Sequence, residues 1–577
     1  MEDLLLIVLL AVVVIAVTTV LGQRLGVAGP LLLVALGIGV ALLPFVHVPE
    51  INPEWILVGV LPPLLYSAAV NLPAIEFRRD FGPIAGLSVL LVVLSSVVLG
   101  LFFWMAVPSV GLPLGIALGA ILSPTDAVAT SIVKKLGITP RVVTMLEGES
   151  LLNDATALVL LRTAIVAIAG GFSFGATVGN FVWAVLLALV VGAIVGYLTL
   201  RLRAWVGNSA ANTAISFTVP FIAYLPTEHF GGSGLVAAVV AGIVTGQGAA
   251  RWLTPEQRMS DTLNWRTIEL VLEGGVFLVM GLELKDIVGE NIRSEAGLWH
   301  GAWLALSALA IVLAVRAVYV TFLVLAQSRR ARRMSRERLE QFGARIDAVD
   351  RSPAEAKLRG PQDPARRARR LDSMRSRVSR ALADLDYYQA SPLGWKHGTI
   401  IVWAGMRGVV TLAAAQTLPR DGSIDSRALL VFVAFLVAVG SLMLQGFTLP
   451  WVVRALKLER EGEDGESREE QSRLDEQLRV AAASALQKPS LTKRNGEAFD
   501  PALLERIGAR MTQPPDDENS AVAKDALELR LVMIEAMRGR LNELSHGGTF
   551  STVALRHALA ELDADELSLQ LRLREDD

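Results

Sequence analysis

The sequence predicts an all-α polytopic membrane protein, and two observations lead to this fold class. Apolar residues make up 53% of the 577 residues and the mean hydropathy is +0.48, whereas soluble proteins are about 45–50% apolar even with glycine counted. The apolar residues also form runs of roughly 17–25 residues, the length that crosses a bilayer as a helix. No strand-like alternation supports a membrane β-barrel, which leaves a helical bundle.

The same runs divide the chain into four segments. Residues 1–326 hold eleven apolar spans and residues 396–453 hold two more; the charged residues 327–395 form an insert, and residues 454–577 form a tail. We therefore expect about thirteen transmembrane helices, at 4–21, 29–46, 55–72, 83–107, 112–135, 142–169, 178–200, 211–227, 232–247, 265–284, 298–326, 397–418 and 428–453.

The first span is expected to stay in the protein. A secretory signal peptide begins with basic residues, but Glu2 and Asp3 are acidic, and no convincing small-residue cleavage site follows the run that ends near Gly22.

The distribution of Lys and Arg orients the helices, because cytoplasmic loops carry an excess of both. An outside N-terminus places most loop cations in the cytoplasm and leaves mainly Lys285, Arg293, Arg420 and Arg427 outside. The stretch from Arg329 to Lys396 holds eighteen Lys or Arg against nine Asp or Glu and falls on the cytoplasmic side. We predict a multi-pass protein of the cell inner (plasma) membrane, with the insert and the C-terminus in the cytoplasm.

The insert and the tail are predicted to be helical. The basic insert is typical of a solvated helical hairpin, and it could also contact anionic lipid headgroups. Basic tracts can bind nucleic acid as well, but no nucleic acid partner is expected here. The tail mixes apolar and charged residues at helical spacing, which indicates a cytoplasmic regulatory domain whose ligand is unknown.

Two absences limit the chemistry. The chain has no cysteine, which excludes disulfides, thiolate metal sites and cysteine nucleophiles. It also has no Walker-type phosphate loop. We expect a gradient-driven secondary transporter rather than an enzyme, with no cofactor.

The sixth span carries polar residues that would be costly in a bilayer without a function. Ser150, Asn153 and Asp154 are three and four residues apart, so a helix projects them from one face. Hard cations prefer such oxygen ligands, and one carboxylate with neutral oxygens suits a monovalent cation. The carboxylate can also hold a proton, so that proton and cation compete. The alternative is a polar patch that joins helices.

The fifth span is expected to be broken. Pro124 after Ser123 removes a backbone donor and disfavours helix before it, and broken helices near the midplane build ion sites in secondary transporters. Thr125 falls at the break. Asp126 either caps the helix or takes a direct part in function, and the sequence does not favour one over the other.

Three further charges have structural interpretations. Glu149 needs a cation, and Arg316, the single charge within Gly301–Ala326, needs a carboxylate, so we expect a structural ion pair. Arg407 lies between Gly405 and Gly408, which indicates a second helix break. Its guanidinium can offset exposed carbonyl ends there.

The remaining membrane charges are less specific. Glu269 and Glu273 share a helical face in the tenth span, and they either line a cation funnel or form interhelical hydrogen bonds, with the second favoured. Arg162 lies two turns after Asp154, and the sequence names no partner for it.

Together, Ser123–Ala129, Glu149–Asp154, Arg316 and Gly405–Gly408 resemble the bacterial sodium/proton exchangers of the monovalent cation/proton antiporter-1 family. The order and spacing of these segments carry the resemblance, which covers about residues 1–453. It implies an antiporter fold with inverted repeats, in which the broken fifth and twelfth helices cross near the ion site.

The resemblance also implies roles. Asp154 would bind proton and sodium in turn, Ser150, Asn153 and Thr125 would supply oxygens, Asp126 would complete the electrostatics, and Glu149 would pair with Arg316. The Asn153-Asp154 pair resembles the electroneutral version of the site. A homodimer and an elevator-like movement are implied as well.

Two other functions remain open at this stage. Side-chain oxygens do not fix the ion radius, so potassium/proton exchange is an alternative. A membrane-anchored sensor on a degenerate transporter scaffold is another, and the intact Asp154 site argues against it.

Overall fold

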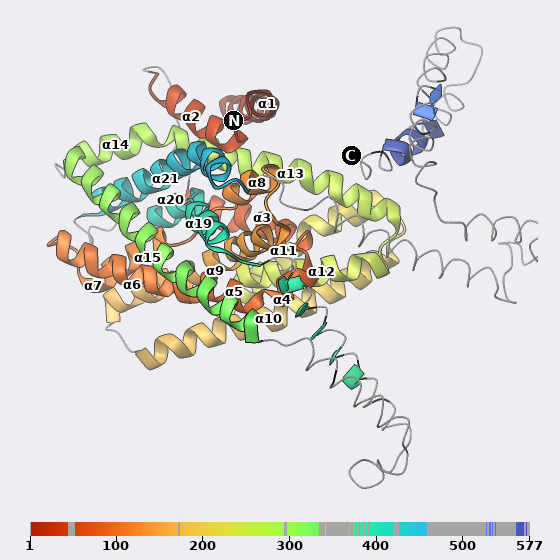
Figure 1. Cartoon of the computed structure of the whole chain (residues 1–577). Coiled ribbons are helices and arrows are strands. Elements are labelled where there is room, and N and C mark those ends of the chain that lie inside the picture. Colours follow the sequence, from red (N-terminus) through yellow and green to blue (C-terminus); the bar gives the residue numbers. More distant parts are fainter. Residues whose placement is uncertain are drawn as a thin grey trace, which may run out of the picture. The chain divides into compact units, whose positions relative to one another are not determined.

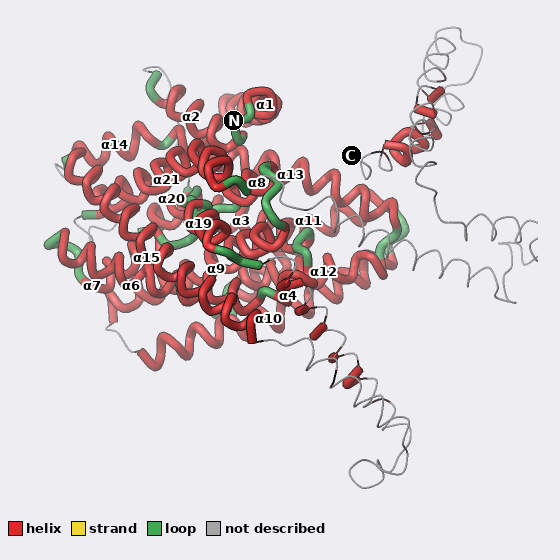
Figure 2. The backbone as a smooth tube through the Cα atoms, viewed as in Figure 1, coloured by secondary structure: helices red, strands yellow, loops and turns green. Residues whose placement is uncertain are grey.

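A computed structural model describes residues 2–43, 52–170, 174–293, 297–333, 392–418 and 426–458, together with scattered residues between 341 and 389 and between 527 and 573. All regular structure within these residues is helical (Figures 1 and 2). The chain forms two compact units, Met1–Glu461 and Gly462–Asp577. Most of the predicted tail and most of the insert lie outside the described residues.

The first half of the larger unit contains fourteen helical elements within the described residues. They are α1 (Glu2–Leu25), α2 (Gly29–Ala41), η1 (Trp55–Val60), α3 (Leu61–Val70), α4 (Ala74–Arg79), α5 (Phe81–Ala85), η2 (Gly86–Leu90), α6 (Leu91–Ala106), α7 (Leu112–Leu122), α8 (Val128–Lys135), α9 (Pro140–Gly170), α10 (Phe174–Trp205), α11 (Ser209–His229) and α12 (Gly234–Trp252).

The second half of this unit continues in the same way. Its helices are α13 (Pro255–Leu282), α14 (Leu284–Arg293), α15 (Leu298–Arg333), α19 (Trp395–Trp403), α20 (Val409–Gln416) and α21 (Arg427–Leu456). The elements η1 and η2 are short π-helical turns that continue directly into α3 and α6.

Each of the thirteen predicted apolar spans overlaps helix among the described residues, and the spans 112–135 and 397–418 are interrupted between two helices. Among the described residues, six helices are long and apolar enough to cross a membrane by themselves: Leu5–Leu25, Phe81–Ala106, Pro140–Ala167, Val178–Trp205, Leu298–Arg329 and Arg427–Leu456. The other spans are shorter, broken or more polar. An all-helical membrane protein is confirmed, while thirteen crossings and inverted repeats stay predictions.

Local sequence explains where several helices begin. Pro255 occupies the first turn of α13, where its missing N–H costs nothing. The Thr254 hydroxyl accepts a hydrogen bond from the Gln257 backbone at 3.3 Å, and the Gln257 side chain accepts one from the Thr254 N–H at 3.0 Å, which is a capping box. The Asn208 side chain caps α11 in a similar way, through the Ala211 N–H at 2.9 Å.

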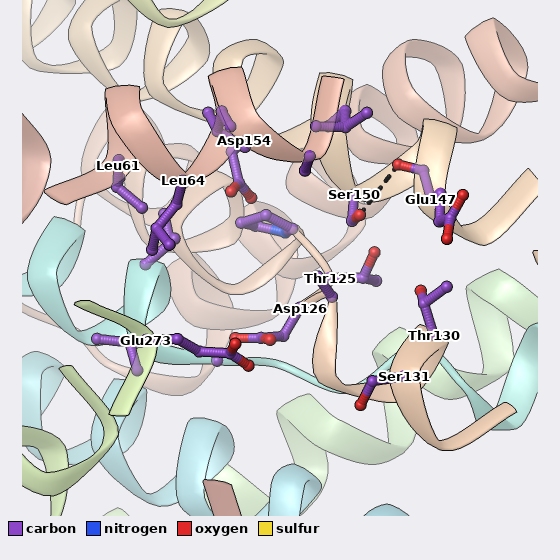
Figure 3. A pocket seen from close by; sticks show the side chains of 18 of the residues that line it. Leu61, Leu64, Thr125, Asp126, Thr130, Ser131, Glu147, Ser150, Asp154 and Glu273 are labelled. Carbon is purple, nitrogen blue, oxygen red and sulfur yellow. Dashed lines mark hydrogen bonds between the residues drawn. The ribbon is translucent and has the colours of Figure 1, made fainter. Parts of the chain in front are cut away.

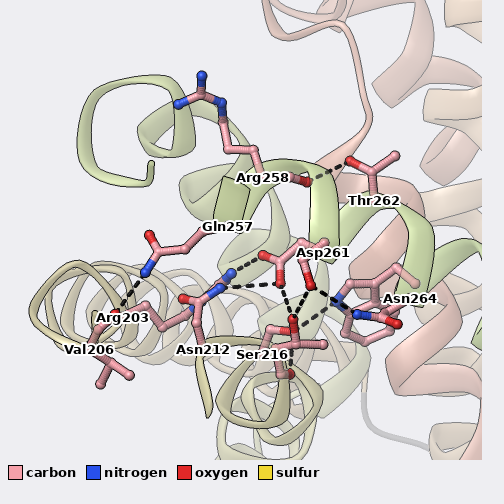
Figure 4. Close-up of polar contacts among 12 residues, drawn as sticks. Arg203, Val206, Asn212, Ser216, Gln257, Arg258, Asp261, Thr262 and Asn264 are labelled. Atoms are coloured by element: carbon pink, nitrogen blue, oxygen red, sulfur yellow. Dashed lines mark hydrogen bonds and ion pairs between the residues drawn. The ribbon is translucent and has the colours of Figure 1, made fainter. Parts of the chain in front are cut away.

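A buried polar network joins α10, α11 and α13 (Figure 4). Arg203, which is 1% exposed, forms an ion pair with Asp261 and donates a hydrogen bond to Asn212 at 3.0 Å. Thr213 donates to the same Asp261 carboxylate at 3.2 Å. The sequence alone does not identify Asp261 as the partner of Arg203. A buried guanidinium needs such a partner, so this network fixes three helix ends together.

The end of the insert packs against other helices of the larger unit, to which it belongs. Asp80 and Arg141 form a buried bidentate pair at 2.9 and 3.0 Å. The Tyr387 hydroxyl donates a hydrogen bond to Asp80 at 3.0 Å, and the Tyr388 hydroxyl donates one to the Arg79 carbonyl at 2.7 Å. Burial, and then the Asp80 charge, raise the pKa of Tyr387, so its hydroxyl keeps the proton that it donates. The insert therefore contacts the start of α9.

Close helix contact between α2 and α13 depends on small residues. A Cβ added at Gly37 would lie 2.5 Å from the Leu278 carbonyl oxygen and 2.9 Å from the Gly281 Cα. Without water to drive association, membrane helices pack through such close backbone approach.

We predict that Gly37→Ala lowers the free energy of unfolding by about 1–3 kcal/mol, the usual cost of overpacking. Gly39→Ala is the matched control in the same helix, because nothing lies within 4 Å of a Cβ there. Thermal melting of both variants in detergent measures the difference. Equal melting temperatures would contradict this account of the α2–α13 contact.

Candidate functional site

Two helix breaks meet at the centre of the site. The α7 helix ends at Leu122 and α8 begins at Val128, with Pro124 between them, as the sequence predicts. A second break separates α19 from α20. The Asp126 N–H donates a hydrogen bond to the Met406 carbonyl at 2.8 Å, so the two unwound segments are in direct contact. Both breaks, and their contact, agree with the antiporter fold that the resemblance implies.

Asp126 caps a helix at this contact. Its Oδ1 accepts a hydrogen bond from the Val128 N–H, the first residue of α8, at 2.9 Å. The carboxylate also lies against Gly408 and the Val409 backbone N–H at the start of α20. Helix N-termini carry partial positive charge, so two helix ends stabilise this carboxylate. The structure thus places the Asp126 carboxylate at the start of two helices, in agreement with a capping role, and a direct part in function stays a prediction.

Arg407 satisfies carbonyl groups at the breaks. Its side chain is 1% exposed and donates hydrogen bonds to the carbonyl of Leu122, the last residue of α7, at 3.2 Å, and to the Gly405 carbonyl. Its backbone N–H donates to the Ser441 hydroxyl at 2.9 Å. This is the offset of carbonyl ends that the sequence predicts for the guanidinium.

Glu149 and Arg316 form the structural ion pair expected from the sequence. Both side chains are 2% exposed, and the guanidinium contacts both carboxylate oxygens, with Nη2 and Oε2 2.8 Å apart. The Thr125 hydroxyl donates to Glu149 at 3.2 Å, and the Asn153 amide donates to that hydroxyl at 2.7 Å. A continuous polar chain therefore runs from α15 through α9 to the break after α7.

Asn153 lies apart from the two other residues of its predicted group. Ser150 and Asp154 are four residues apart and line a common cavity, whereas Asn153 points to Thr125 and does not line it. Consecutive helical residues are separated by about 100°, which places Asn153 on the Thr125 side of α9. Its Oδ1 is buried without a hydrogen-bond partner among the described residues.

The cavity has a volume of about 390 Å³ and lies between two groups of helices. One wall comes from α3 and α13, and the other comes from α8, α9, α20 and the segments that precede α8 and α20. Figure 3 shows Asp126, Asp154 and Glu273 directed into this space, with Ser150 and Thr125 beside them.

Burial of the Asp154 carboxylate in this cavity is energetically costly. The side chain is only 7% exposed, yet its carboxylate makes no hydrogen bond and no ion pair within the part of the chain that the structure describes. Ser150 donates its own proton to the Glu147 carbonyl at 3.1 Å, which leaves its oxygen lone pairs for another group. A buried carboxylate normally has a partner, so a proton or a cation fits this position.

Several lining residues escaped the sequence analysis. Lys134 and Glu147 face each other at 3.9 Å at the cavity wall. Thr130 and Thr411 line the cavity with hydroxyls that lack partners among the described residues. The sequence signal for these two threonines was weak, because threonine is common in membrane helices. Both lie just after the breaks, in α8 and α20.

The structure places the remaining membrane charges. Glu269 and Glu273 both line the cavity, and the Glu269 side chain also forms a hydrogen bond with Ser67 of α3, so Glu269 fits both interpretations. Arg162 finds its partner in α11: its Nη1 lies 2.5 Å from Oε2 of Glu228. Glu228 in turn accepts a hydrogen bond from the Gly234 N–H at the start of α12 at 3.0 Å.

Comparisons with known proteins agree with this geometry. The profile of the family described as "Sodium/hydrogen exchanger, transmembrane" matches residues 8–342 and 376–455. The uncharacterized Na(+)/H(+) exchanger YjcE of Escherichia coli is 28% identical over 94% of this chain and 94% of its own length. The sodium, potassium, lithium and rubidium/H(+) antiporter of Bacillus pumilus is 32% identical over 46% of this chain and 41% of its own length.

A solved structure has a similar fold. The sodium proton antiporter MjNhaP1 from Methanocaldococcus jannaschii superimposes with a TM-score of 0.56 and 17% identity, covering 80% of this chain and all of that one. At this identity the likeness concerns the fold alone.

We predict that Glu149→Gln lowers the free energy of unfolding by about 3–5 kcal/mol, because it leaves a buried guanidinium without a counter-charge. Glu290→Gln is the control: it breaks the half-exposed pair with Arg427, 3.4 Å apart, and should cost at most about 1 kcal/mol. Thermal melting in detergent compares the two. Similar losses would argue against a structural role for the Glu149–Arg316 pair.

The contact between the breaks yields a second prediction. A Cβ at Gly408 would overlap the Asp126 carboxylate, whereas one at Gly440 in α21 meets nothing within 4 Å. We expect Gly408→Ala to lose most transport and about 1–3 kcal/mol of stability, and Gly440→Ala to keep both. Transport in vesicles and melting in detergent measure these effects. Unimpaired transport in Gly408→Ala would exclude a tight fit at this crossing.

Proposed function

The chain belongs to the sodium/hydrogen exchanger family, and we propose that it exchanges sodium for protons, with Asp154 holding the two ions in turn. Family membership makes it a membrane-embedded cation/proton antiporter. The proposal concerns sodium as the transported ion, the role of each residue and the stoichiometry of exchange.

The state of Asp154 is the observation that supports this proposal. A carboxylate that is 93% buried, open to a cavity and free of protein partners among the described residues can lower its energy by taking a proton or a cation. Ser150 and Thr125 place neutral oxygens beside it, which suits a monovalent ion. Asp126 supports the site by holding the two helix ends, and Asn153 acts indirectly by orienting Thr125.

Each step of the cycle follows from competition at one group. With a proton on Asp154, this carboxyl group is neutral and holds no cation. When the proton leaves through the cavity, the carboxylate attracts a cation, and the pair that they form is again neutral. The net charge of the site is therefore the same in both loaded forms. One cation then exchanges for one proton, which makes the transport electroneutral and suits a role in pH homeostasis.

Other features of the proposal concern the surroundings. We place the protein in the inner (plasma) membrane, with the N-terminus outside and the insert and tail in the cytoplasm. The outward apolar faces of α1 and α10 suit lipid or a second copy of the chain, in keeping with a homodimer. Membrane lipids are thus partners, and the ligand of the tail is unassigned.

Potassium/proton exchange is the second candidate. The Bacillus pumilus relative is named for sodium, potassium, lithium and rubidium exchange, and the oxygens at the cavity do not fix an ion radius. Ion preference therefore needs a direct test.

We predict that proteoliposomes with the intact protein dissipate an imposed pH gradient when sodium is added, and that Asp154→Asn reduces this rate to the level of empty liposomes. Asparagine keeps the size of the side chain but holds neither a charge nor a titrating proton. Lithium and potassium are compared in the same assay, and a potential-sensitive dye reports charge movement.

The outcomes separate the candidates. A faster response to potassium would favour the second candidate, and a dye signal generated by transport would exclude electroneutral exchange. Activity that survives Asp154→Asn would remove this residue from the mechanism. Folded protein that responds to no ion would favour the sensor interpretation.

A further inference from the structure

A second carboxylate faces the site from the opposite wall. Asp126 and Asp154 belong to the wall formed by α9 and the break before α8, whereas Glu273 comes from α13. Figure 3 shows the Glu273 carboxylate directed toward that of Asp126, and the two are close enough to repel each other. Asp126 also repels Asp154. Asp126 therefore interacts with both of the other carboxylates, and all three line one cavity.

The cavity lining carries more negative than positive charges. The cavity is lined by five carboxylates, those of Asp126, Glu147, Asp154, Glu269 and Glu273, and by one cation, Lys134. Lys134 lies beside Glu147, and Lys135 acts on Glu273 without forming an ion pair within the described residues. The helix ends of α8 and α20 stabilise Asp126.

Glu273 resembles Asp154 in lacking a partner. Its side chain forms no hydrogen bond and no ion pair among the described residues. The residue that precedes it by one turn, Glu269, adds repulsion. Interhelical hydrogen bonding, the other role considered for Glu273, therefore receives no support from the structure.

We propose that Glu273 sets the affinity of the Asp154 site for both transported ions through its charge. This inference rests on the proposed function. While it is ionised, a carboxylate across a small cavity attracts a sodium ion and a proton equally, because both carry one positive charge. Glu273 is thus a positioning residue for the exchange, placed on the wall opposite Asp154.

The proposal has a pH signature that loss of structure would not produce. Removing the Glu273 charge weakens sodium and proton binding by the same factor. At alkaline pH no proton competes, so the apparent KM for sodium rises by that factor. At acidic pH the weaker sodium binding is offset by weaker proton competition, so the apparent KM hardly changes. Inhibition by protons consequently begins at a lower pH.

The test is the apparent KM for sodium of Glu273→Gln in proteoliposomes, measured across a pH series. We expect a rise of roughly three- to tenfold at alkaline pH, the size of a partly screened interaction across a cavity, with little change at acidic pH and a nearly unchanged maximal rate. Glu273→Asp keeps the charge and should restore most of the affinity. Unchanged KM values throughout, or a lower maximal rate alone, would overturn the proposal.

Two further variants make the result decisive. Lys135→Gln removes the opposing charge at an exposed position of α8, so its KM at alkaline pH should fall slightly; an unchanged value would count against the proposal even if Glu273→Gln does not fold. Asp154→Asn in the same series tests the proposed function separately. If Asp154→Asn is inactive while Glu273→Gln behaves as the unmodified protein, this inference alone fails.

Discussion

This structure depends on one constraint: backbone groups that lack helical partners must find hydrogen bonds inside a membrane that offers no water. Each of the two breaks frees N–H and C=O groups that must be satisfied by the protein. The chain meets this need by crossing the breaks: the Asp126 N–H binds the Met406 carbonyl, the Asp126 carboxylate caps α8, and the Arg407 guanidinium binds the last carbonyl of α7. These contacts link both segments, and residues of both segments line the cavity.

The same constraint separates structural charges from transport charges. Glu149 with Arg316, and Arg203 with Asp261, are buried and paired, so their charges are neutralised within the protein. Asp154 lies one turn after Glu149 on the same helix, yet it faces the cavity and has no such partner among the described residues. The helix directs the Glu149 carboxylate toward an arginine, where it supports the fold. It directs the Asp154 carboxylate toward the cavity, where it is available to an ion.

Sequence reasoning succeeded where a membrane makes a residue costly. Pro124 predicted the first break, the glycines around Arg407 predicted the second, and the isolated charge of Arg316 identified Glu149 as its partner. Cation/proton antiport followed from the combined pattern and is supported by the family match.

Prediction from the sequence was less successful where the outcome depends on the direction of a side chain or on which helices are neighbours. Periodicity grouped Asn153 with Ser150 and Asp154, but the angle between neighbouring residues turns Asn153 toward Thr125. Arg162 with Glu228 and Arg203 with Asp261 are pairs from different helices, and nothing in a single sequence states which helices are neighbours. The cavity position of Glu273 depends on how α13 packs against α2, which close contact at glycine decides.

Competition between a proton and a cation at Asp154 is the central claim, and proton release measures it without transport. Sodium is added to purified protein in weakly buffered detergent solution, and the protons released are counted against the sodium bound across a range of pH. The account predicts one proton released for each sodium ion bound when the site begins protonated, and no release from Asp154→Asn. Sodium binding without proton release, or release that persists in Asp154→Asn, would contradict it.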